Sequence, residues 1–268
     1  MHEILTVLPG GSRVLDLGSG SGSFDASQLA CNVVRADLDV PAPVPNAFVR
    51  CSASELPFAN ASFQALVLNH SLEHLENLPQ CVTEMARVLA PGARLYIAVP
   101  DASTLTDRLY RWLARGGGHV NLFTDPDTVV RMITDATGLP HAGTRVLYTS
   151  LSFANRFNLK SRPPGKLLLL ANGNETFLRV LNWALRKLDR WLGLRTSAYG
   201  WAFYFGELPS DADLEAWSNV CVRCGSGHAS ATLKAEGRVT ERRFLPSVYR
   251  CPHCRTANFF FEDVWGRG

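Results

Sequence analysis

The stretch Val14-Leu-Asp-Leu-Gly-Ser-Gly-Ser-Gly22 decides the fold of this chain. A short apolar run leads directly into three glycines at alternate positions, Gly18, Gly20 and Gly22, and Asp16 lies two residues before the first. Glycine lets the backbone turn sharply and approach a ligand closely, which a Cβ atom would prevent. A strand, a glycine loop and a following helix would place that ligand at the carboxyl edge of a parallel sheet, beside a helix N-terminus.

Two classes of cofactor use such a loop. A dinucleotide fingerprint requires Gly-x-Gly-x-x-Gly, whereas here position 23 is serine and the third glycine comes one position early. The carboxylate of Asp16 would repel a pyrophosphate, but it suits the ammonium and sulfonium of S-adenosylmethionine. Asp37, at the end of the next expected strand (residues 32–36), can accept hydrogen bonds from both ribose hydroxyls. We therefore predict S-adenosylmethionine as the cofactor.

Further motifs occur in an order that resembles the class I S-adenosylmethionine-dependent methyltransferases, in the broad group with "LPF" and "LEH" signatures. They are Ser54-Glu-Leu-Pro-Phe-Ala-Asn-Ala-Ser-Phe63, a strand over 65–68, Asn69-His-Ser-Leu-Glu-His74, a helix over 79–89, a Pro91-Gly92 turn and a strand over 94–99. The resemblance covers about residues 10–150 and returns near 198–206. It implies a Rossmann-like, doubly wound α/β sheet whose antiparallel last strand is expected at residues 198–205.

The resemblance also implies a cofactor pocket made by the glycine loop and the ends of the following strands. Its expected residues are Asp16, Gly18, Ser19, Gly20, Gly22, Asp37, Leu38, Ser52, Ala53 and Asn69. Ser52 stands where the family usually has an aspartate that binds the adenine amino group, and Gln64 also replaces a usual aspartate. Three prolines within residues 41–45 exclude the usual second helix, so we expect a loop there.

Three histidines are candidates for the catalytic role. The cofactor supplies the reactive carbon, so the protein mostly orients the acceptor, and a base helps if the acceptor is a hydroxyl. His70 directly follows the expected fourth strand, and His74 ends the "LEH" signature. His119 lies in a loop, residues 116–124, that resembles the substrate-facing His-x-x-x-Phe-Thr loop of the family. A packing role is the alternative for His74 and His119, and Glu73 is expected only to start a helix.

Four of the seven cysteines form two Cys-x-x-Cys pairs, Cys221/Cys224 and Cys251/Cys254, with 26 residues between them. Four thiolates complete a tetrahedral Zn²⁺ site that is closed to water, and such a zinc is structural. Two disulfides are the alternative, which a reducing cytosol disfavours. Residues 231–236, 242–250 and 258–262 are each expected to form strands, so the sequence predicts a small C-terminal β zinc ribbon.

Residues 151–197 do not fit the methyltransferase pattern and are expected to form a basic helical insertion. Between residues 156 and 195 there are nine basic and two acidic residues, a net charge of +7. A helix over 175–194, capped by Asn174, would have two distinct faces. The apolar face would comprise Phe177, Leu181, Ala184, Leu185, Leu188, Trp191 and Leu192, and the polar face Arg179, Asn182, Arg186, Asp189 and Arg190.

Three interpretations of this insertion stay open. The helix could pack on its own domain and leave its arginines solvated, or it could lie at a membrane surface or on a lipid substrate through residues 174–194. Nucleic-acid binding is the least favoured, because the aromatic residues lie on the apolar side of the helix.

Composition sets outer limits on these hypotheses. The 268 residues, 46% of them hydrophobic, suffice for one α/β domain and a smaller one. A net charge of +3 does not by itself imply nucleic acid. Residues 1–8 lack the features of a secretory signal, and no run reaches the ~18 apolar residues of a membrane span. We therefore expect a cytoplasmic protein, with a peripheral location at the inner membrane surface as its variant.

We divide the chain into a methyltransferase core (1–150), the basic insertion (151–197), the last core strand (198–210) and the zinc ribbon (211–268). The predicted function is methyl transfer from S-adenosylmethionine to a small molecule or a glycan- or lipid-linked acceptor, with oxygen as the expected atom. An RNA methyltransferase that grips RNA through the ribbon and insertion is one alternative, although no Asn/Asp-Pro-Pro-Tyr motif follows the fourth strand. A non-catalytic binding protein that keeps the fold is the other, suggested by the altered adenine contact at Ser52.

Overall fold

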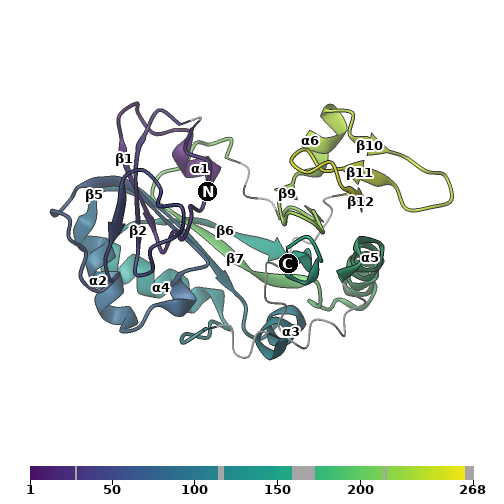
Figure 1. The fold of residues 1–268 in the computed structure, drawn as a ribbon, viewed down its shortest axis with the longest axis horizontal. Helices are drawn as coiled ribbons and strands as arrows, with labels where there is room; N and C mark the ends of the chain where they lie inside the picture. The colour runs from purple at the N-terminus through teal and green to yellow at the C-terminus, as the bar shows by residue number, and fades with distance from the viewer. Residues whose placement is uncertain (28, 114–117, 159–172, 213, 215, 263–268) are drawn as a thin grey trace. The chain divides into compact units, whose positions relative to one another are not determined.

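The computed structural model describes residues 1–27, 29–113, 118–158, 173–212, 214 and 216–262 (Figure 1). Contacts divide the chain into two compact units, each built from three stretches of sequence. The first unit comprises Met1–Ala102, Gly118–Arg145 and Trp201–Leu214, and the second Ser103–Gly117, Val146–Gly200 and Glu215–Gly268. The chain therefore leaves the first unit and returns to it twice.

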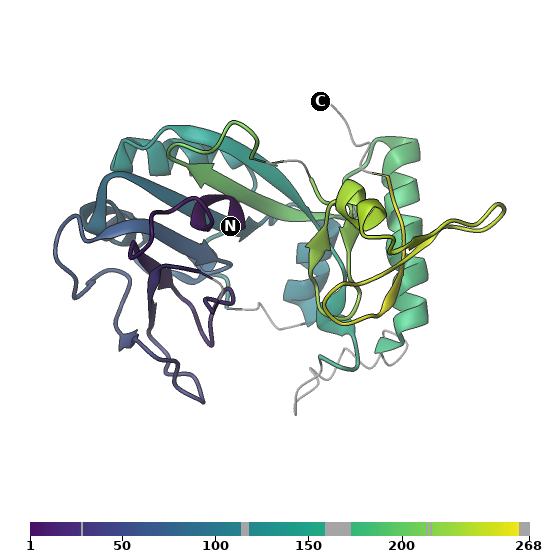
Figure 2. The ribbon, with the colours of Figure 1, turned by 90° about the horizontal axis from the view of Figure 1, so that it is seen from above.

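A seven-stranded sheet with the order β3-β2-β1-β4-β5-β7-β6 organises the first unit. Its strands are β1 (Arg13–Leu17), β2 (Asn32–Asp37), β3 (Phe48–Arg50), β4 (Phe63–Asn69), β5 (Leu89–Pro100), β6 (His141–Tyr148) and β7 (Ala198–Phe205). The neighbours from β3 to β5 pair in parallel, and β7, the last strand, is antiparallel (Figure 2). The predicted Rossmann-like sheet is confirmed.

The central strands are apolar on both faces, which is typical of parallel strands covered on both sides. In β4, residues 65–68 are all fully buried. The helices of this unit are α1 (His2–Leu5), the 3-10 turn η1 (Leu72–His74), α2 (Leu78–Val88) and α4 (Pro126–Thr137). The strand order reverses between β1 and β4, and in such sheets ligands bind at the carboxyl edge of the reversal.

The expected helix after the glycine loop is wrong. Residues 18–27 and 29–31 form turns and bends, with no helix among them. Only nine residues separate Gly22 from β2, which is too short for a helix and its connection, and Asp25 instead accepts a local hydrogen bond from the Ser27 amide at 2.9 Å. The glycine loop therefore cannot use a helix N-terminus to bind a ligand. The loop expected after Asp37 is present, since residues 38–47 form no helix.

The strand expected over residues 94–99 begins earlier, at Leu89. The predicted Pro91-Gly92 turn is instead a bulge inside β5, where the pairing with β4 shifts register between Phe63 and Ala65. Gly92 has a φ of 71°, which lets β5 continue through this irregularity.

The second unit combines the insertion with the cysteine-rich C-terminal segment. It contains α3 (Leu105–Leu113), η2 (Ser152–Ala154), α5 (Glu175–Leu192), β8 (Asn219–Val220), β9 (Gly227–His228), α6 (Ser230–Ala235), β10 (Val239–Thr240), β11 (Val248–Arg250) and β12 (Ala257–Phe259). Strands β8 and β9 pair antiparallel, as do β10, β11 and β12. Figure 2 shows α5 running beside these small strands.

In the C-terminal segment one expected strand is wrong and another is shorter than expected. Residues 231–236 belong mainly to the helix α6, because the run Ala-Thr-Leu-Lys-Ala favours a helix and buries one apolar side chain, Leu233, rather than alternate ones. Of residues 242–250 only Val248–Arg250 forms a strand.

Helix α5 is capped by Asn174 as predicted, but it does not pack with all its arginines solvated, as one of the three interpretations has it. The buried side chains are Leu178, Asn182, Arg186 and Asp189, whereas Phe177, Val180, Leu188, Trp191 and Leu192 are exposed. Trp191 is 83% exposed. The helix therefore packs through its polar side and leaves most of its large apolar side chains uncovered.

Backbone groups at the packed side explain this orientation, because buried carbonyls and amides need hydrogen-bond partners. Asn182 donates to the Ser150 carbonyl at 2.6 Å, and Arg186 donates to the Thr149 carbonyl at 3.2 Å. Asp189 accepts hydrogen bonds from the amides of Thr196 at 2.7 Å and Ser197 at 2.6 Å.

The start of α5 is tied to the first cysteine pair. Leu178 packs in an apolar cluster with Leu151, Ala154 and Val222, and Glu175 forms an ion pair with Arg223. The insertion and the cysteine-rich segment thus share a core within the second unit.

Candidate functional site

The glycine loop follows β1 at the carboxyl edge of the sheet. The amides of Gly18 and Ser19 donate to the Ala36 carbonyl at 2.8 and 3.2 Å, and the Gly20 amide donates to Asp37 Oδ2 at 2.7 Å. A Cβ atom at Gly18 would stand 2.5 Å from Ser71 Cβ, whereas at Gly20 nothing lies within 4 Å. The chain's own packing therefore requires Gly18, and Gly20 borders the open space that a ligand can fill.

Two carboxylates flank this loop. Asp16 is fully buried at the end of β1, and its Oδ2 accepts from the Ser23 amide at 2.9 Å and lies 3.8 Å from Arg35 Nε. Burial raises the pKa of Asp16. Its other oxygen, Oδ1, is buried and has no hydrogen-bond partner among the described residues. Asp37 is half-buried, and its Oδ1 accepts from the Asp39 amide at 3.1 Å.

These features fit the predicted cofactor. The buried Asp16 oxygen without a partner needs a hydrogen-bond donor or a cation. The open space next to Gly20 leaves room for the cofactor. Gly22 is required by the packing of the chain itself, since a Cβ atom there would stand 2.8 Å from the Arg35 guanidinium. Asp16 is therefore buried and binds the loop through the Ser23 amide. Asp37 is the carboxylate whose side chain stays partly exposed and can reach a ribose.

The other predicted cofactor residues follow strand ends at the same edge. Leu38 comes directly after β2 and is exposed, which suits an apolar contact with an adenine ring. Ser52 and Ala53 come soon after β3, and Asn69 ends β4; all three are half-buried. The Ser52 hydroxyl lies 2.8 Å from the Ser54 hydroxyl, so it is partly engaged within the chain.

The three predicted histidines surround one buried carboxylate, Glu73. His70 Nδ1 lies 3.7 Å and His74 Nε2 3.9 Å from Glu73 Oε1. The rings of His74 and His119 meet edge to face with 5.0 Å between their centroids. The structure thus brings His70, His74 and His119 together at the carboxyl edge, next to β4.

Glu73 is the residue of this candidate site that sequence reasoning missed, because it was expected only to start a helix. Its side chain is 2% exposed, and its Oε2 has no hydrogen-bond partner in the described part of the chain. The spacing His70-x-x-Glu73-His74 could have indicated that Glu73 lies beside His70, since residues three apart lie on the same side of a helical turn.

The loop that carries His119 is fixed to this turn through its backbone. The amides of Val120 and Asn121 both donate to the Glu73 carbonyl, at 2.9 and 3.0 Å. The Asn121 side chain also donates to the carbonyls of Leu72 at 3.2 Å and Leu75 at 2.8 Å. Two segments far apart in sequence are therefore held side by side at the histidines.

The turn at residues 70–74 also contacts the glycine loop. Ser71 Oγ donates to the Gly18 carbonyl at 2.9 Å. His70 has a φ of 57°, a conformation that costs energy for a residue with a Cβ atom and that often occurs at functional sites. Its amide donates to the Ala98 carbonyl of β5 at 3.0 Å.

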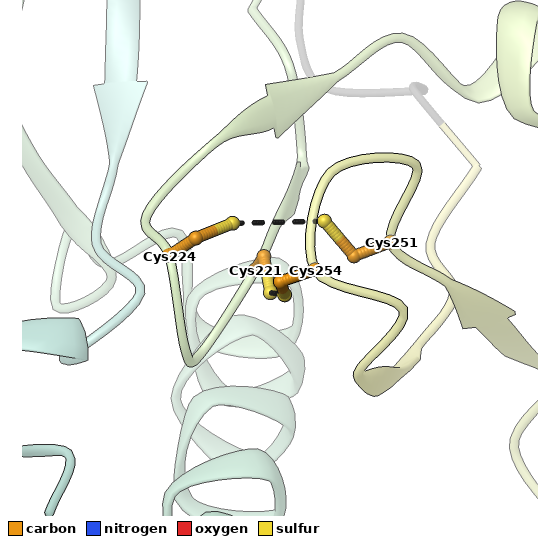
Figure 3. Close-up of side chains that lie close together, drawn as sticks. All are labelled: Cys221, Cys224, Cys251 and Cys254. Carbon is orange, nitrogen blue, oxygen red and sulfur yellow. Dashed lines mark hydrogen bonds between the residues drawn. The ribbon is translucent and has the colours of Figure 1, made fainter. Parts of the chain in front are cut away.

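The four cysteines of the second unit form one cluster, with all side chains directed inward from two loops (Figure 3). Cys221 Sγ lies 3.4 Å from Cys254 Sγ, and Cys224 Sγ lies 3.6 Å from Cys251 Sγ. Sulfur ligands of a tetrahedral zinc stand about 3.8 Å apart, given Zn–S bonds of about 2.3 Å. The cluster therefore has the size of a Zn²⁺ site, and all four cysteines are free thiols.

The two loops share one backbone pattern. The Gly225 amide donates to the Cys221 carbonyl and the Arg255 amide to the Cys251 carbonyl, both at 2.9 Å. Both donors have positive φ, 76° at Gly225 and 61° at Arg255. Amides in such turns point at the first sulfur, and the Arg223 amide lies 3.4 Å from Cys221 Sγ.

His228 is the nearest additional imidazole, with Nε2 3.4 Å from Cys251 Sγ. Its ring stacks on that of His253 with 5.6 Å between centroids. The four thiols already supply the four ligands of a tetrahedral Zn²⁺ site, so neither histidine is required as a ligand of that ion.

Residues 15–97 match the family described as "Methyltransferase domain". The chain is 31% identical over 130 residues to a malonyl-[acyl-carrier protein] O-methyltransferase of Methylococcus capsulatus, covering 43% of this chain and 47% of that protein. It is 35% identical over 97 residues to a demethylmenaquinone methyltransferase of Beutenbergia cavernae, covering 33% and 40%. The chain thus spans less than half the length of these curated relatives.

A solved structure described as a methyltransferase from an antibiotic biosynthesis pathway of Anabaena variabilis aligns with a TM-score of 0.50 and 16% identity. The alignment covers 77% of this chain and 94% of that one, and it supports the fold. None of the helices in the described ranges is long and apolar enough to cross a membrane.

Proposed function

We propose that this protein, whose residues 15–97 match a methyltransferase domain, transfers a methyl group from S-adenosylmethionine. The proposed acceptor is an oxygen atom of a small molecule or of a glycan- or lipid-linked compound. The observation that carries this proposal is the carboxyl edge of the sheet, where an open glycine position, Gly20, lies beside the half-buried carboxylate of Asp37.

The residues divide the work as follows. When bound, S-adenosylmethionine supplies an electrophilic methyl carbon, and its sulfur keeps the electron pair of the breaking bond. Asp37 would accept hydrogen bonds from the ribose hydroxyls, and Leu38 and Ala53 would lie against the adenine. His70 accepts the hydroxyl proton of the acceptor while the acceptor oxygen forms the new bond to carbon. Glu73 Oε1, 3.7 Å from His70 Nδ1, would stabilise the charge that His70 gains with this proton.

Calorimetry with S-adenosylmethionine, with NADH as the competing cofactor class, tests the donor. We expect S-adenosylmethionine to bind and NADH not to bind. Absence of heat at millimolar S-adenosylmethionine would refute the enzyme and leave the non-catalytic alternative. The acceptor atom is tested with S-adenosylmethionine carrying a tritiated methyl group and with lipid and small-molecule extracts. Release of methanol by mild base would identify a methyl ester, and base-stable label on nitrogen would contradict transfer to oxygen.

We also propose that the four-cysteine cluster binds one structural Zn²⁺. Four thiolates leave no open position for water, so this ion stabilises the second unit and takes no part in the reaction.

The exposed face of α5 supports a third element of the proposal, a peripheral contact with an anionic membrane surface. A shallow apolar groove on this face is lined by Trp183, Ala184, Lys187, Leu188, Arg190 and Trp191. Between residues 176 and 192 the only acidic residue is Asp189, which is buried. An exposed apolar face edged by cations is typical of a helix that lies in the interfacial plane of a bilayer.

A second exposed apolar region lies in the same unit, at the end of a hairpin. The hairpin between β10 and β11 exposes Phe244 at 90% and Leu245 at 63%, directly after Arg242 and Arg243. Aromatic and leucine side chains next to arginines provide the same two attractions, apolar insertion and binding to anionic headgroups. Residues 167–170, a run of four leucines, lie outside the described residues.

Vesicle sedimentation of the full chain, with and without phosphatidylglycerol, tests this contact. We expect binding only to the anionic vesicles, with loss of binding in Trp191→Glu and Phe244→Glu and no change in the control Val44→Glu, which is also exposed. Absence of vesicle binding would overturn the proposal. Salt-sensitive retention of RNA or concentration-dependent self-association, each abolished by Trp191→Glu, would assign the face to those partners instead.

A further inference from the structure

We propose that Glu73, His74 and His119 bind one divalent first-row transition-metal ion, such as Mn²⁺, Fe²⁺ or Zn²⁺, beside the methyl-donor pocket. One ligand atom from each of the three residues lies within 4.8 Å of the other two. This site belongs to the first unit and uses none of the four cysteines. It therefore adds a second ion to the proposed structural zinc.

The tautomer of His74 suits metal binding. Its Nδ1 lies 3.0 Å from the Gly118 carbonyl, and a carbonyl only accepts, so Nδ1 carries the proton. The lone pair is then on Nε2, the atom 3.9 Å from Glu73 Oε1. Metal-binding histidines almost always donate their other N–H group to a carbonyl or carboxylate in this way. Gly118, with a φ of 76°, allows the close backbone approach that makes this bond.

The second observation is the carboxylate itself. Glu73 is buried, and its Oε2 has no hydrogen-bond partner among the described residues. A buried anion is costly unless it is paired or coordinates a metal. The Glu73 carbonyl accepts hydrogen bonds from the amides of Val120 and Asn121, so the backbone that carries His119 is bound next to that of Glu73.

The donor set defines the class of ion. Two imidazoles and one carboxylate suit Mn²⁺, Fe²⁺, Co²⁺ or Zn²⁺, and three protein ligands leave positions open for a substrate oxygen. Ligand atoms around such an ion stand about 3.0 to 3.5 Å apart. The three side chains, 3.9 Å apart for Glu73 and His74 and within 4.8 Å overall, would therefore move slightly closer on binding.

The position of the site gives the ion a role. Ser71, two residues before Glu73, contacts Gly18 of the donor loop. A hydroxyl oxygen bound to the ion would have a lowered pKa and a fixed position at the edge of the donor pocket. His70 is 3.7 Å from Glu73 Oε1 but is not one of the three ligands, so it keeps the role of proton acceptor. This role rests on the proposed methyl transfer, whereas binding of the ion does not.

Titration with Mn²⁺, followed by the electron paramagnetic resonance signal of the free ion, tests the site on the full chain with its zinc retained. Mn²⁺ is suitable because a four-thiolate site disfavours it. We expect one bound Mn²⁺ per chain and at least a tenfold weaker affinity in Glu73→Gln and His119→Gln. The controls Glu76→Gln and His141→Ala change exposed residues of the same types and should bind Mn²⁺ like the unmodified protein.

The outcomes separate the two proposals. Failure to retain Mn²⁺, or equal retention in Glu73→Gln and His119→Gln, overturns the metal site. Circular dichroism melts identify a variant that fails to fold, and the other ligand variant then decides. If Mn²⁺ binds but S-adenosylmethionine does not, the metal site stands and the proposed function fails. If both bind, the ion should selectively broaden the methyl resonance of S-adenosylmethionine, and an unaffected resonance would remove its role at the acceptor.

Discussion

Replacing Asp189 by alanine should destabilise the protein far more than replacing the large aromatic residue two positions later, Trp191. Asp189 is buried on α5 and accepts four hydrogen bonds, from the Thr196 amide at 2.7 Å and hydroxyl at 2.5 Å and from the Ser197 amide and hydroxyl, both at 2.6 Å. Trp191 is 83% exposed. The pair therefore tests which side of the helix is packed.

The magnitude follows from what each truncation leaves behind. Asp189→Ala leaves two amides without an acceptor, at about 1 to 3 kcal/mol for each unsatisfied buried group. The two hydroxyls can rotate to other acceptors, so we expect a loss of about 3 kcal/mol. Asp189→Asn keeps one acceptor oxygen and should lose about half as much. Trp191→Ala should change stability by no more than about 0.5 kcal/mol, as for other exposed positions.

Equilibrium unfolding of the full chain in urea, followed by circular dichroism, measures these differences. Asp135→Ala, on an exposed position of α4, is the matched control and should resemble the unmodified protein. If the apolar face were packed instead, Trp191→Ala would cost about 3 to 5 kcal/mol and Asp189→Ala almost nothing. That inverted result would refute the orientation of α5.

Three further predictions concern the donor loop, the cysteine cluster and the ion pair at the start of α5. Gly20→Ala should weaken S-adenosylmethionine binding at least tenfold in calorimetry at a stability cost of about 1 kcal/mol, whereas Gly18→Ala, whose Cβ would meet Ser71 at 2.5 Å, should also lower the melting temperature clearly. Elemental analysis should find one zinc in the four-cysteine site, lost in Cys251→Ser and kept in the control Cys31→Ser; an unchanged zinc content in Cys251→Ser would contradict the site. Arg223 lowers the pKa of Glu175, so the ion pair stabilises the fold above the unfolded pKa of about 4.3 and loses this effect as the pH falls through the lower folded value. The stability difference between the unmodified protein and Glu175→Gln, about 1 kcal/mol at pH 7, should therefore shrink as the pH falls below about 4.3. A difference that urea titrations show to be independent of pH would count against the pair.

The sheet and the cysteine cluster could be predicted because local chemistry determines them. Strands such as β4 are apolar on both faces, and only burial between two layers accommodates that pattern. Two Cys-x-x-Cys pairs have few other uses in one chain. The helix expected after the glycine loop was wrong because the motif was extended by analogy, although only nine residues precede β2.

The orientation of α5 could not be predicted, because periodicity identifies two faces without saying which one is covered. The groups that cover the polar side are carbonyls at Thr149 and Ser150 and amides at Thr196 and Ser197. They come from segments before and after the helix, and their need for hydrogen bonds appears only once the chain is folded. The exposed tryptophan face is the consequence, and it is the reason for testing a membrane contact.

The turn at residues 70–74 holds the glycine loop and the loop of His119 in a fixed arrangement. On one side Ser71 binds the carbonyl of Gly18, and the close contact there excludes any side chain at position 18. On the other side the Glu73 carbonyl receives the amides of Val120 and Asn121, which carry His119 toward His74. The glycine loop and the loop of His119 are therefore both fixed to five consecutive residues. A change of the Ser71 side chain should disturb the glycine loop first, and a change at Asn121 the loop of His119 first, because the Ser71 hydroxyl donates to Gly18 and the Asn121 side chain to the carbonyls of Leu72 and Leu75.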